Sequence, residues 1–175
     1  MILPRPRPRH AGFTLIELIM VIVLIAILSV VAISRSNSVS DLTLQSQAEK
    51  MASDLRHTQA LATSLGRNLS FSVSPGSNGT YQVSCTHGST YTYKLSDAPC
   101  DSDPIIDPGT RQAFKVTLEK GTVLGALQGT TLTFDTLGKP NASHSYSLAS
   151  SKWTIYVGVT AETGLAVVCT AAPCP

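Results

Sequence analysis

The chain divides into three regions by the spacing at which hydrophobic residues recur. From Phe13 to Ile33 the residues are almost all apolar, and Glu17 is the one strongly polar side chain. At about 1.5 Å per residue, a helix over this segment is roughly 31 Å long, which matches the hydrocarbon core of a bilayer. The pattern therefore predicts a transmembrane helix over residues 13–33.

The second region, residues 34–66, has a helical period. A polar, weakly helical segment at 34–38 marks the point where the chain leaves the bilayer, and Asp41 is a suitable N-cap for a resumed helix. Gly66 predicts the end of that helix. His57 is expected to be an ordinary exposed helix residue. The apolar stripe of this amphipathic continuation is expected to pack on a sheet; it comprises Leu44, Ala48, Met51, Leu55, Ala62 and Leu65.

In the third region, residues 67–175, the period changes to two. Short alternating runs follow one another with turn residues between them and no intervening helix, which predicts an antiparallel sheet or sandwich. The fold class is therefore α+β, with a long N-terminal helix followed by an extracytoplasmic β-rich domain. The predicted strands are 69–73, 81–85, 91–95, 114–118, 122–127, 131–134, 144–148, 153–159 and 165–169.

The residues before the apolar run indicate a processed leader, residues 1–12. The leader contains Arg5, Arg7 and Arg9 and no acidic residue, so it stays cytoplasmic and the later domain is exported. An ordinary signal peptide has its cleavage site after the apolar region. Here the small pair Ala11-Gly12 comes first, so that cleavage after Gly12 would keep the helix on the mature chain. A plain, uncleaved anchor is the alternative.

Glu17 needs an explanation because a carboxylate in a bilayer costs about 2.5 to 3.5 kcal/mol. Cleavage would create a charged amine on Phe13, one helical turn away, and a neighbouring subunit would offer the same amine. Such a pair would set the register between packed helices, because an unpaired buried carboxylate penalises a wrong stagger. Alternatively, Glu17 lies near the headgroups and is solvated.

These residues resemble a type IV prepilin: Gly12 is the last leader residue, Phe13 the first mature residue and Glu17 the fifth. The resemblance implies a prepilin peptidase that cuts between Gly12 and Phe13 and methylates the Phe13 amine. It also implies a pilin-like fold and assembly with other pilins or pseudopilins, through an inner-membrane assembly platform, into a pilus or a type II secretion pseudopilus.

Two strand–turn segments narrow the resemblance. Residues 131–140, with Phe134-Asp135 and Leu137-Gly138, and residues 153–168, with Ala161-Glu162-Thr163-Gly164, are similar to the GspH/FimT family of minor pseudopilins and minor pilins. They are also similar to minor pilins of mannose-sensitive haemagglutinin (MSHA) type pili. Family members proposed to bind DNA carry arginines where this chain reads Gly164-Leu165-Ala166-Val167. Nucleic acid is therefore not expected as a partner, because phosphate contacts need Lys or Arg.

Four cysteines in an exported domain predict disulfides. Of the three possible pairings, we favour the neighbour pairs Cys85–Cys100 and Cys169–Cys174, each closing a local loop; a tie between the C-terminal cysteines and the Cys85–Cys100 region stays open. A zinc site from Cys85, His87 and Cys100 lacks the paired spacing of structural zinc sites.

Charge and the remaining polar residues mainly exclude classes of function. Without the three leader arginines the formal net charge falls from +2 to −1, so the basic balance belongs to the leader. The four histidines are scattered and no nucleophile, zinc or phosphate-loop motif is present, so neither an enzyme nor a cofactor is expected. The aspartates at 97, 101, 103 and 107 could hold calcium, but a solvated loop is the preferred interpretation and no metal is predicted.

The sequence therefore predicts a minor pilin or pseudopilin, a structural subunit that helps to initiate a filament from the inner membrane, with its C-terminal domain in the periplasm. The alternative is a binding module at a pilus tip, an adhesin or a receptor for secretion substrates, with residues 85–111 as its recognition surface.

Overall fold

The fold is given by a computed structural model that describes residues 14–86, 99–172 and Cys174, and the side chains of all of these except residues 30–41. The chain forms two compact units, Met1–Val39 and Ser40–Pro175. The helix α1 (Leu15–Leu65) contributes to both, and the strands found among the described residues belong to the second unit.

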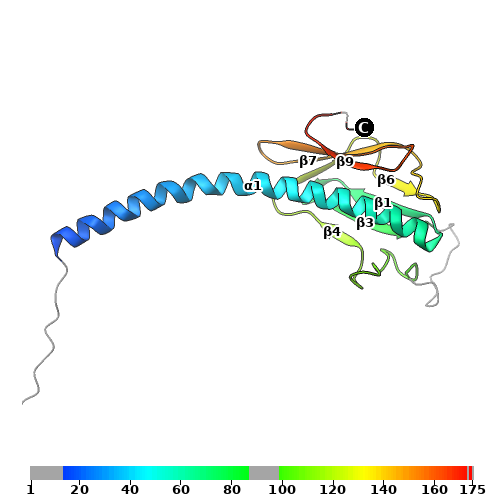
Figure 1. Cartoon of the computed structure of the whole chain (residues 1–175), viewed down its shortest axis with the longest axis horizontal. Helices are drawn as coiled ribbons and strands as arrows, with labels where there is room; N and C mark the ends of the chain where they lie inside the picture. The colour runs from blue at the N-terminus through cyan, green and yellow to red at the C-terminus, as the bar shows by residue number, and fades with distance from the viewer. Residues whose placement is uncertain (1–13, 87–98, 173, 175) are drawn as a thin grey trace, which may run out of the picture. The chain divides into compact units, whose positions relative to one another are not determined.

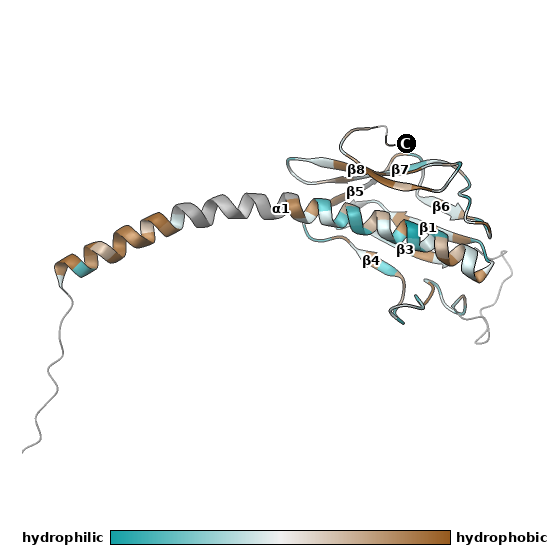
Figure 2. Cartoon of the chain, in the orientation of Figure 1, coloured by the Kyte–Doolittle hydropathy of each residue, from teal (hydrophilic) through white to brown (hydrophobic). Residues whose placement is uncertain are grey.

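In the first unit, the described part of α1 is almost wholly apolar. Its large hydrophobic side chains between Leu15 and Leu28 are exposed, and Figure 2 shows this stretch mostly in the colours of hydrophobic residues. Among the described residues, no helix combines the length and the hydropathy needed to cross a membrane. Phe13 and the side chains of residues 30–33, which belong to the predicted span, lie outside the described part.

The prediction that a second helix starts at Asp41 is wrong, because α1 continues through this position without a break. Serine and asparagine each reduce helix stability only slightly, whereas a new helix must form a costly first turn. Extending one helix through the polar segment is therefore favoured over nucleating two.

The end of α1 follows the sequence prediction. Gly66 has φ +62°, the left-handed conformation that glycine adopts without a Cβ clash. The Gly66 N–H donates to the carbonyl of Thr63, and the Arg67 N–H donates to that of Ala62. These two bonds form a Schellman motif, which satisfies the last carbonyls of the helix.

The second unit contains two antiparallel sheets (Figure 1). The strand orders are β4-β3-β1-β6 and β2-β5-β7-β8-β9. The α+β class predicted from the sequence, a long N-terminal helix followed by antiparallel β structure, is therefore confirmed. The strands are β1 (Leu69–Ser74), β2 (Gly76–Ser77), β3 (Thr80–Cys85), β4 (Lys115–Thr117), β5 (Val123–Ala126), β6 (Thr131–Phe134), β7 (His144–Ala149), β8 (Thr154–Val159) and β9 (Ala166–Cys169).

Most predicted strands are present, with ends that differ by a few residues. The short strand β2 was not predicted, because two residues carry no readable alternation. The predicted strand at 91–95 lies outside the described residues. In β1, Leu69, Phe71 and Val73 are buried and the serines between them are not, as alternation requires.

The second half of α1 supplies one wall of the core. All of its predicted apolar stripe is buried except Leu65, which is partly buried against the same cluster. The helix side chains pack with residues of both sheets, among them Phe71, which stacks on Tyr81 with ring centroids 5.0 Å apart. Burying each large apolar side chain contributes about 1.5 to 3 kcal/mol.

Candidate functional site

The described part of the predicted processing site begins at Thr14, since Gly12 and Phe13 lie outside the described residues. Thr14 immediately precedes α1, and Glu17 is in its first turn. The Glu17 N–H donates to the Thr14 hydroxyl at 3.3 Å and to the Thr14 carbonyl at 3.1 Å. The spacing Thr-x-x-Glu is that of a capping box, a signal that the sequence analysis missed.

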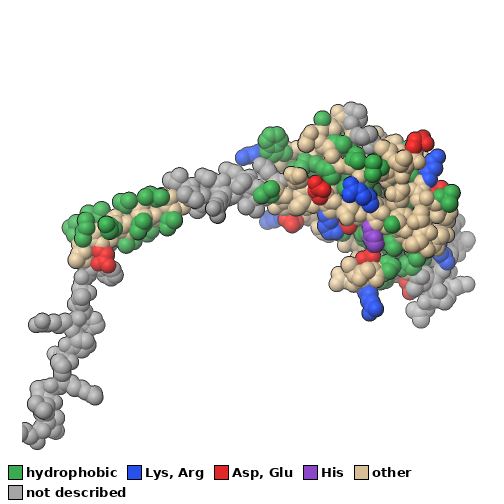
Figure 3. Space-filling model, in the orientation of Figure 1, with side chains coloured by type: hydrophobic (Ala, Val, Ile, Leu, Met, Phe, Trp, Pro, Cys, Tyr) green, Lys and Arg blue, Asp and Glu red, His purple; other side chains and the backbone are tan. Residues whose placement is uncertain are grey.

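The cap gives Glu17 a role within its own helix. A carboxylate in the first turn is stabilised by the helix dipole, typically by about 0.3 to 1 kcal/mol. The Glu17 side chain is exposed and is the one charged group between Leu15 and Ser29. Figure 3 shows the surface of this stretch as largely hydrophobic. The carboxylate is thus available to a group outside this chain.

In the second unit, the turns within the two segments that resemble the GspH/FimT family, 131–140 and 153–168, both contact one helix residue, Gln59. Its side-chain amide donates to the carbonyl of Gly138 at 2.9 Å and to that of Thr163 at 2.9 Å. Gly164 has φ +68°, and a Cβ added there would clash with the amide of Gln59. Close packing against Gln59 therefore requires the glycine in the second turn.

Other polar side chains of α1 bind further parts of the β structure. Arg56 donates two guanidinium hydrogen bonds to the carbonyl of Ala166 in β9, the shorter at 2.7 Å. Gln47 donates to the Thr122 hydroxyl and accepts from the backbone N–H of Glu119. The helix is therefore hydrogen-bonded to β9 and to the β4–β5 connection.

The helix also binds β3 through Asp54. The Tyr81 hydroxyl donates to the Asp54 carboxylate at 2.6 Å, and Lys50 donates to the same oxygen at 2.7 Å. Burial, followed by the hydrogen bond and the negative charge of Asp54, raises the pKa of Tyr81 far above its usual value. Tyr81 therefore remains a hydrogen-bond donor at any physiological pH.

His57 is more than the exposed helix residue that the sequence suggested. Its Nε2 lies 2.9 Å from Oδ1 of Asp107. The same oxygen accepts from the Gly109 N–H, and Oδ2 accepts from the backbone N–H and the hydroxyl of Thr110. Burial raises the pKa of Asp107, but the hydrogen bonds from His57, Thr110 and Gly109 outweigh it, and the pKa falls to about 2. An ionised carboxylate can only accept, so Nε2 carries the proton.

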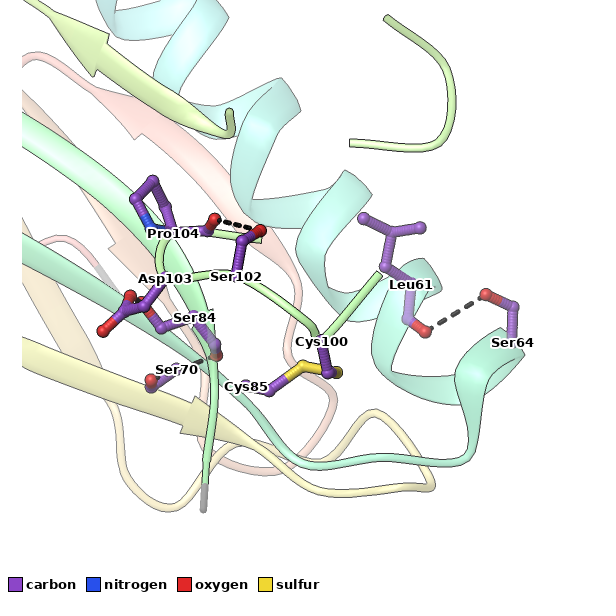
Figure 4. The surroundings of a disulfide bond; sticks show 9 residues. All are labelled: Leu61, Ser64, Ser70, Ser84, Cys85, Cys100, Ser102, Asp103 and Pro104. Carbon is purple, nitrogen blue, oxygen red and sulfur yellow. Dashed lines mark hydrogen bonds between the residues drawn. A yellow bond between two sulfur atoms is a disulfide. The ribbon is translucent and has the colours of Figure 1, made fainter. Parts of the chain in front are cut away.

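The structure joins the cysteines as neighbours, Cys85 to Cys100 and Cys169 to Cys174. The first bridge ties the end of β3 to the following loop (Figure 4). Nearby, the Ser84 hydroxyl donates to the Asp103 carboxylate. Since Cys85 and Cys100 are bonded to each other, they cannot serve as the thiolate ligands of the zinc alternative. His87 lies outside the described residues.

The aspartates of the acidic loop do not converge in the part of the chain that is described. No group of three or more potential His, Cys, Asp or Glu metal ligands occurs there. Asp107 is directed to the helix and Asp103 to β3, so the two carboxylates serve different elements. Asp97 is outside the described residues.

Comparison with known proteins identifies the N-terminal motif and the fold. Residues 7–33 match the family model of the prokaryotic N-terminal methylation motif. No curated protein matches the sequence. A crystal structure of the type IV minor pilin FimU of Pseudomonas aeruginosa PAO1 matches at 15% identity and TM-score 0.52, over 75% of this chain and 92% of that one.

A second crystal form of FimU matches at 14% identity and TM-score 0.50, over 75% of this chain and 96% of that one. The minor pseudopilin EpsH of the Vibrio cholerae type 2 secretion system matches at 10% identity and TM-score 0.52, over 76% of this chain and 99% of that one. Because the identities are low, these matches establish the fold. The chain thus carries a prokaryotic N-terminal methylation motif ahead of a domain with the fold of minor pilins and minor pseudopilins, in agreement with the resemblance to the GspH/FimT family.

Proposed function

We propose that this protein is a minor pilin or pseudopilin, a structural subunit that helps to initiate a type IV pilus, of MSHA-like or related type, or a type II secretion pseudopilus. The observation that carries the proposal is a methylation motif on a capped helix whose exposed surface from Leu15 to Leu28 is apolar apart from Glu17. The fold shared with FimU and EpsH supports the same role.

Processing precedes assembly in this scheme. A prepilin peptidase cuts between Gly12 and Phe13 and methylates the new Phe13 amine, which removes the basic leader. The chain is then held in the inner membrane by residues 13–33, with its N-terminus cytoplasmic and its β-rich domain periplasmic. The assembly platform transfers the subunit into the filament together with other pilins.

Glu17 provides the register of the packed helices. Burial among other apolar helices would leave its carboxylate without water, so it needs a cation. The amine of Phe13, on this subunit or the next, is the proposed partner. A subunit that enters at the wrong stagger leaves this charge unpaired and is rejected.

The test replaces Glu17 with alanine in the full-length chain, in cells that assemble the filament. Glu119→Ala removes an exposed carboxylate from the domain surface and is the matched control. We expect both variants to lose the leader normally, as read by mass spectrometry of the N-terminal peptide. Incorporation of Glu17→Ala into sheared filaments should fall roughly tenfold or more, as for an unpaired buried charge.

Normal incorporation of processed Glu17→Ala would contradict the register argument, and a leader that stays on the chain would contradict the function itself. The neighbouring genes distinguish the two machines. A secretion ATPase, a secretin and other pseudopilins would indicate a pseudopilus, whereas pilus genes would indicate a pilus.

A further inference from the structure

The β domain exposes an apolar groove at one end. The groove has a volume of about 400 Å³ and is lined by Leu44 and Gln45 of α1, Trp153, Thr154 and Ile155 at the start of β8, and Thr170 after β9. Trp153 is 61% exposed, and tryptophan is among the residues enriched at the energetic centres of interfaces.

The tryptophan is held in place by its own turn. The Trp153 N–H donates to the Ser150 hydroxyl at 3.2 Å, and the Ser150 N–H donates to the Trp153 carbonyl at 2.8 Å. Both bonds involve the backbone of Trp153, so they fix the turn that carries the tryptophan at the edge of the groove. The backbone position of the residue is therefore set before a partner binds.

At the other end of the domain, a leucine projects from the β6–β7 turn. Leu137 is 84% exposed, more than any other large hydrophobic residue of the described chain. Its turn is fixed by Asp135, whose carboxylate accepts from the backbone N–H groups of Leu137 and Lys139. Leu165, in the neighbouring turn that also contacts Gln59, is 52% exposed.

The two features lie at opposite ends of the same elements. Leu44 of the groove and Gln59, which binds the turn of Leu137, are fifteen positions apart on α1, or about 22 Å at 1.5 Å per residue. The strand β8 gives the same result, because Trp153 precedes its first residue and the turn that leads to Leu165 follows its last. A projection and a groove at opposite ends favour a head-to-tail contact, which does not close on itself and can propagate.

Charges beside the two features are complementary. Lys152 adjoins Trp153 and Glu162 precedes the turn residue Leu165; within the described chain neither side chain forms an ion pair. A second pair has the opposite sense, with exposed Lys139 beside Leu137 and exposed Glu49 one helical turn after Gln45. Head-to-tail stacking would bring each cation toward a carboxylate.

We infer that the groove around Trp153 receives Leu137 of a second copy of this chain. This inference rests on the proposed function and adds to it a self-association surface on the β domain, separate from the apolar helix. The contact makes the chain directional: one copy can lie ahead of another in the same filament, with the leucine end of one domain against the tryptophan end of the next.

The test places a photoreactive aliphatic diazirine amino acid at Leu137 of the full-length chain, co-expressed with a differently tagged copy in filament-forming cells. We expect crosslinks to the second copy at residues 44–45, 153–155 or 170. The same amino acid at Lys115, an exposed position on β4, should not crosslink there. Trp153→Ala should lower the yield roughly tenfold or more.

Charge reversal distinguishes a specific contact from nonspecific hydrophobic binding by Leu137. Lys152→Glu and Glu162→Lys should each lower the crosslink yield about threefold, and the double variant should restore it, as expected for an exposed ion pair. Crosslinks that map to another protein alone or to another surface would overturn the inference, and so would a double variant that stays low.

The same cells separate this inference from the proposed function. Leader loss and incorporation into sheared filaments are measured in parallel. A chain that is processed and incorporated but does not crosslink through its groove refutes the self-association alone. A chain that is neither processed nor incorporated refutes the proposed function, and the self-association with it.

Discussion

Gln59 bonds to Gly138 through its side-chain amide at 2.9 Å, although 79 residues separate them. The same amide reaches Thr163 in the next turn, so one helix side chain satisfies a carbonyl in each of two loops. Since an intramolecular hydrogen bond contributes about 0.5 to 1.5 kcal/mol, these two bonds help to hold the turns in place.

We expect Gly164→Ala to lower the free energy of unfolding by more than 2 kcal/mol, because the added Cβ meets both a strained φ and the amide of Gln59. Gly66→Ala is the matched control, since Gly66 has a similar φ of +62° but nothing within 4 Å of the added atom. Urea unfolding of the two full-length variants, followed by circular dichroism in mild detergent, measures the difference. Equal losses would show that the contact with Gln59 does not matter.

Replacing Thr14 with valine should weaken the start of α1. The variant keeps the shape of the side chain but removes the hydroxyl that accepts from the Glu17 N–H, at an expected cost of about 0.5 to 2 kcal/mol. Thr14→Ser retains the acceptor and should behave like the native chain. Amide hydrogen exchange in the first turn is the measurement. The cap would be unimportant if valine and serine gave the same exchange rate at Glu17.

The lowered pKa of Asp107 predicts that the free energy of unfolding falls in acid. Its pKa is about 2 when folded, below the ordinary value of 3.8, so the folded state binds this proton more weakly than the unfolded state. The stabilisation, about 2 kcal/mol, is therefore complete above pH 4 and is lost as the pH falls through 2. Unfolding of the native chain and of Asp107→Asn, measured from pH 7 to pH 2, checks this. The difference in free energy of unfolding between the two proteins should shrink as the pH falls from 7 to 2. A difference that stays constant would contradict the lowered pKa of Asp107.

The two disulfides should differ in their contribution. Cys85–Cys100 closes a separation of 15 residues and Cys169–Cys174 one of 5. Loop-closure entropy then gives about 3 and about 2 kcal/mol. Thermal unfolding of the two double-alanine variants measures both. A larger loss from the C-terminal pair would show that native contacts of that segment outweigh the constraint on the unfolded chain.

Local patterns predicted much of the fold from the sequence. Alternation in Leu69–Val73 and the stripe from Leu44 to Ala62 depend on which face is buried, and burial leaves a period in the sequence. Gly66 likewise marks a helix end through its own backbone. The prediction at Asp41 failed because a good cap was judged without comparing a new helix with the continuation of an existing one.

The long-range contacts left no comparable trace. Nothing local in the sequence joins His57 to Asp107 or Gln59 to Gly138, because each pair depends on the packing of elements far apart in the chain. The Thr14–Glu17 cap is different, since its spacing could be read directly. Family resemblance selected the turns at 135–140 and 161–164, and the structure adds that both meet one glutamine.

The hydrogen bonds that Gln47, Asp54, Arg56, His57 and Gln59 form with the β structure have a consequence for how the β domain unfolds. Each reaches a different strand or loop, so removing any one of these elements from the helix breaks bonds in a separate place, and detaching the helix breaks them all. Residues 44–65 are therefore the segment least able to detach while the rest of the β domain stays folded. Partial unfolding should be rare, and a protease should find the domain either intact or open throughout.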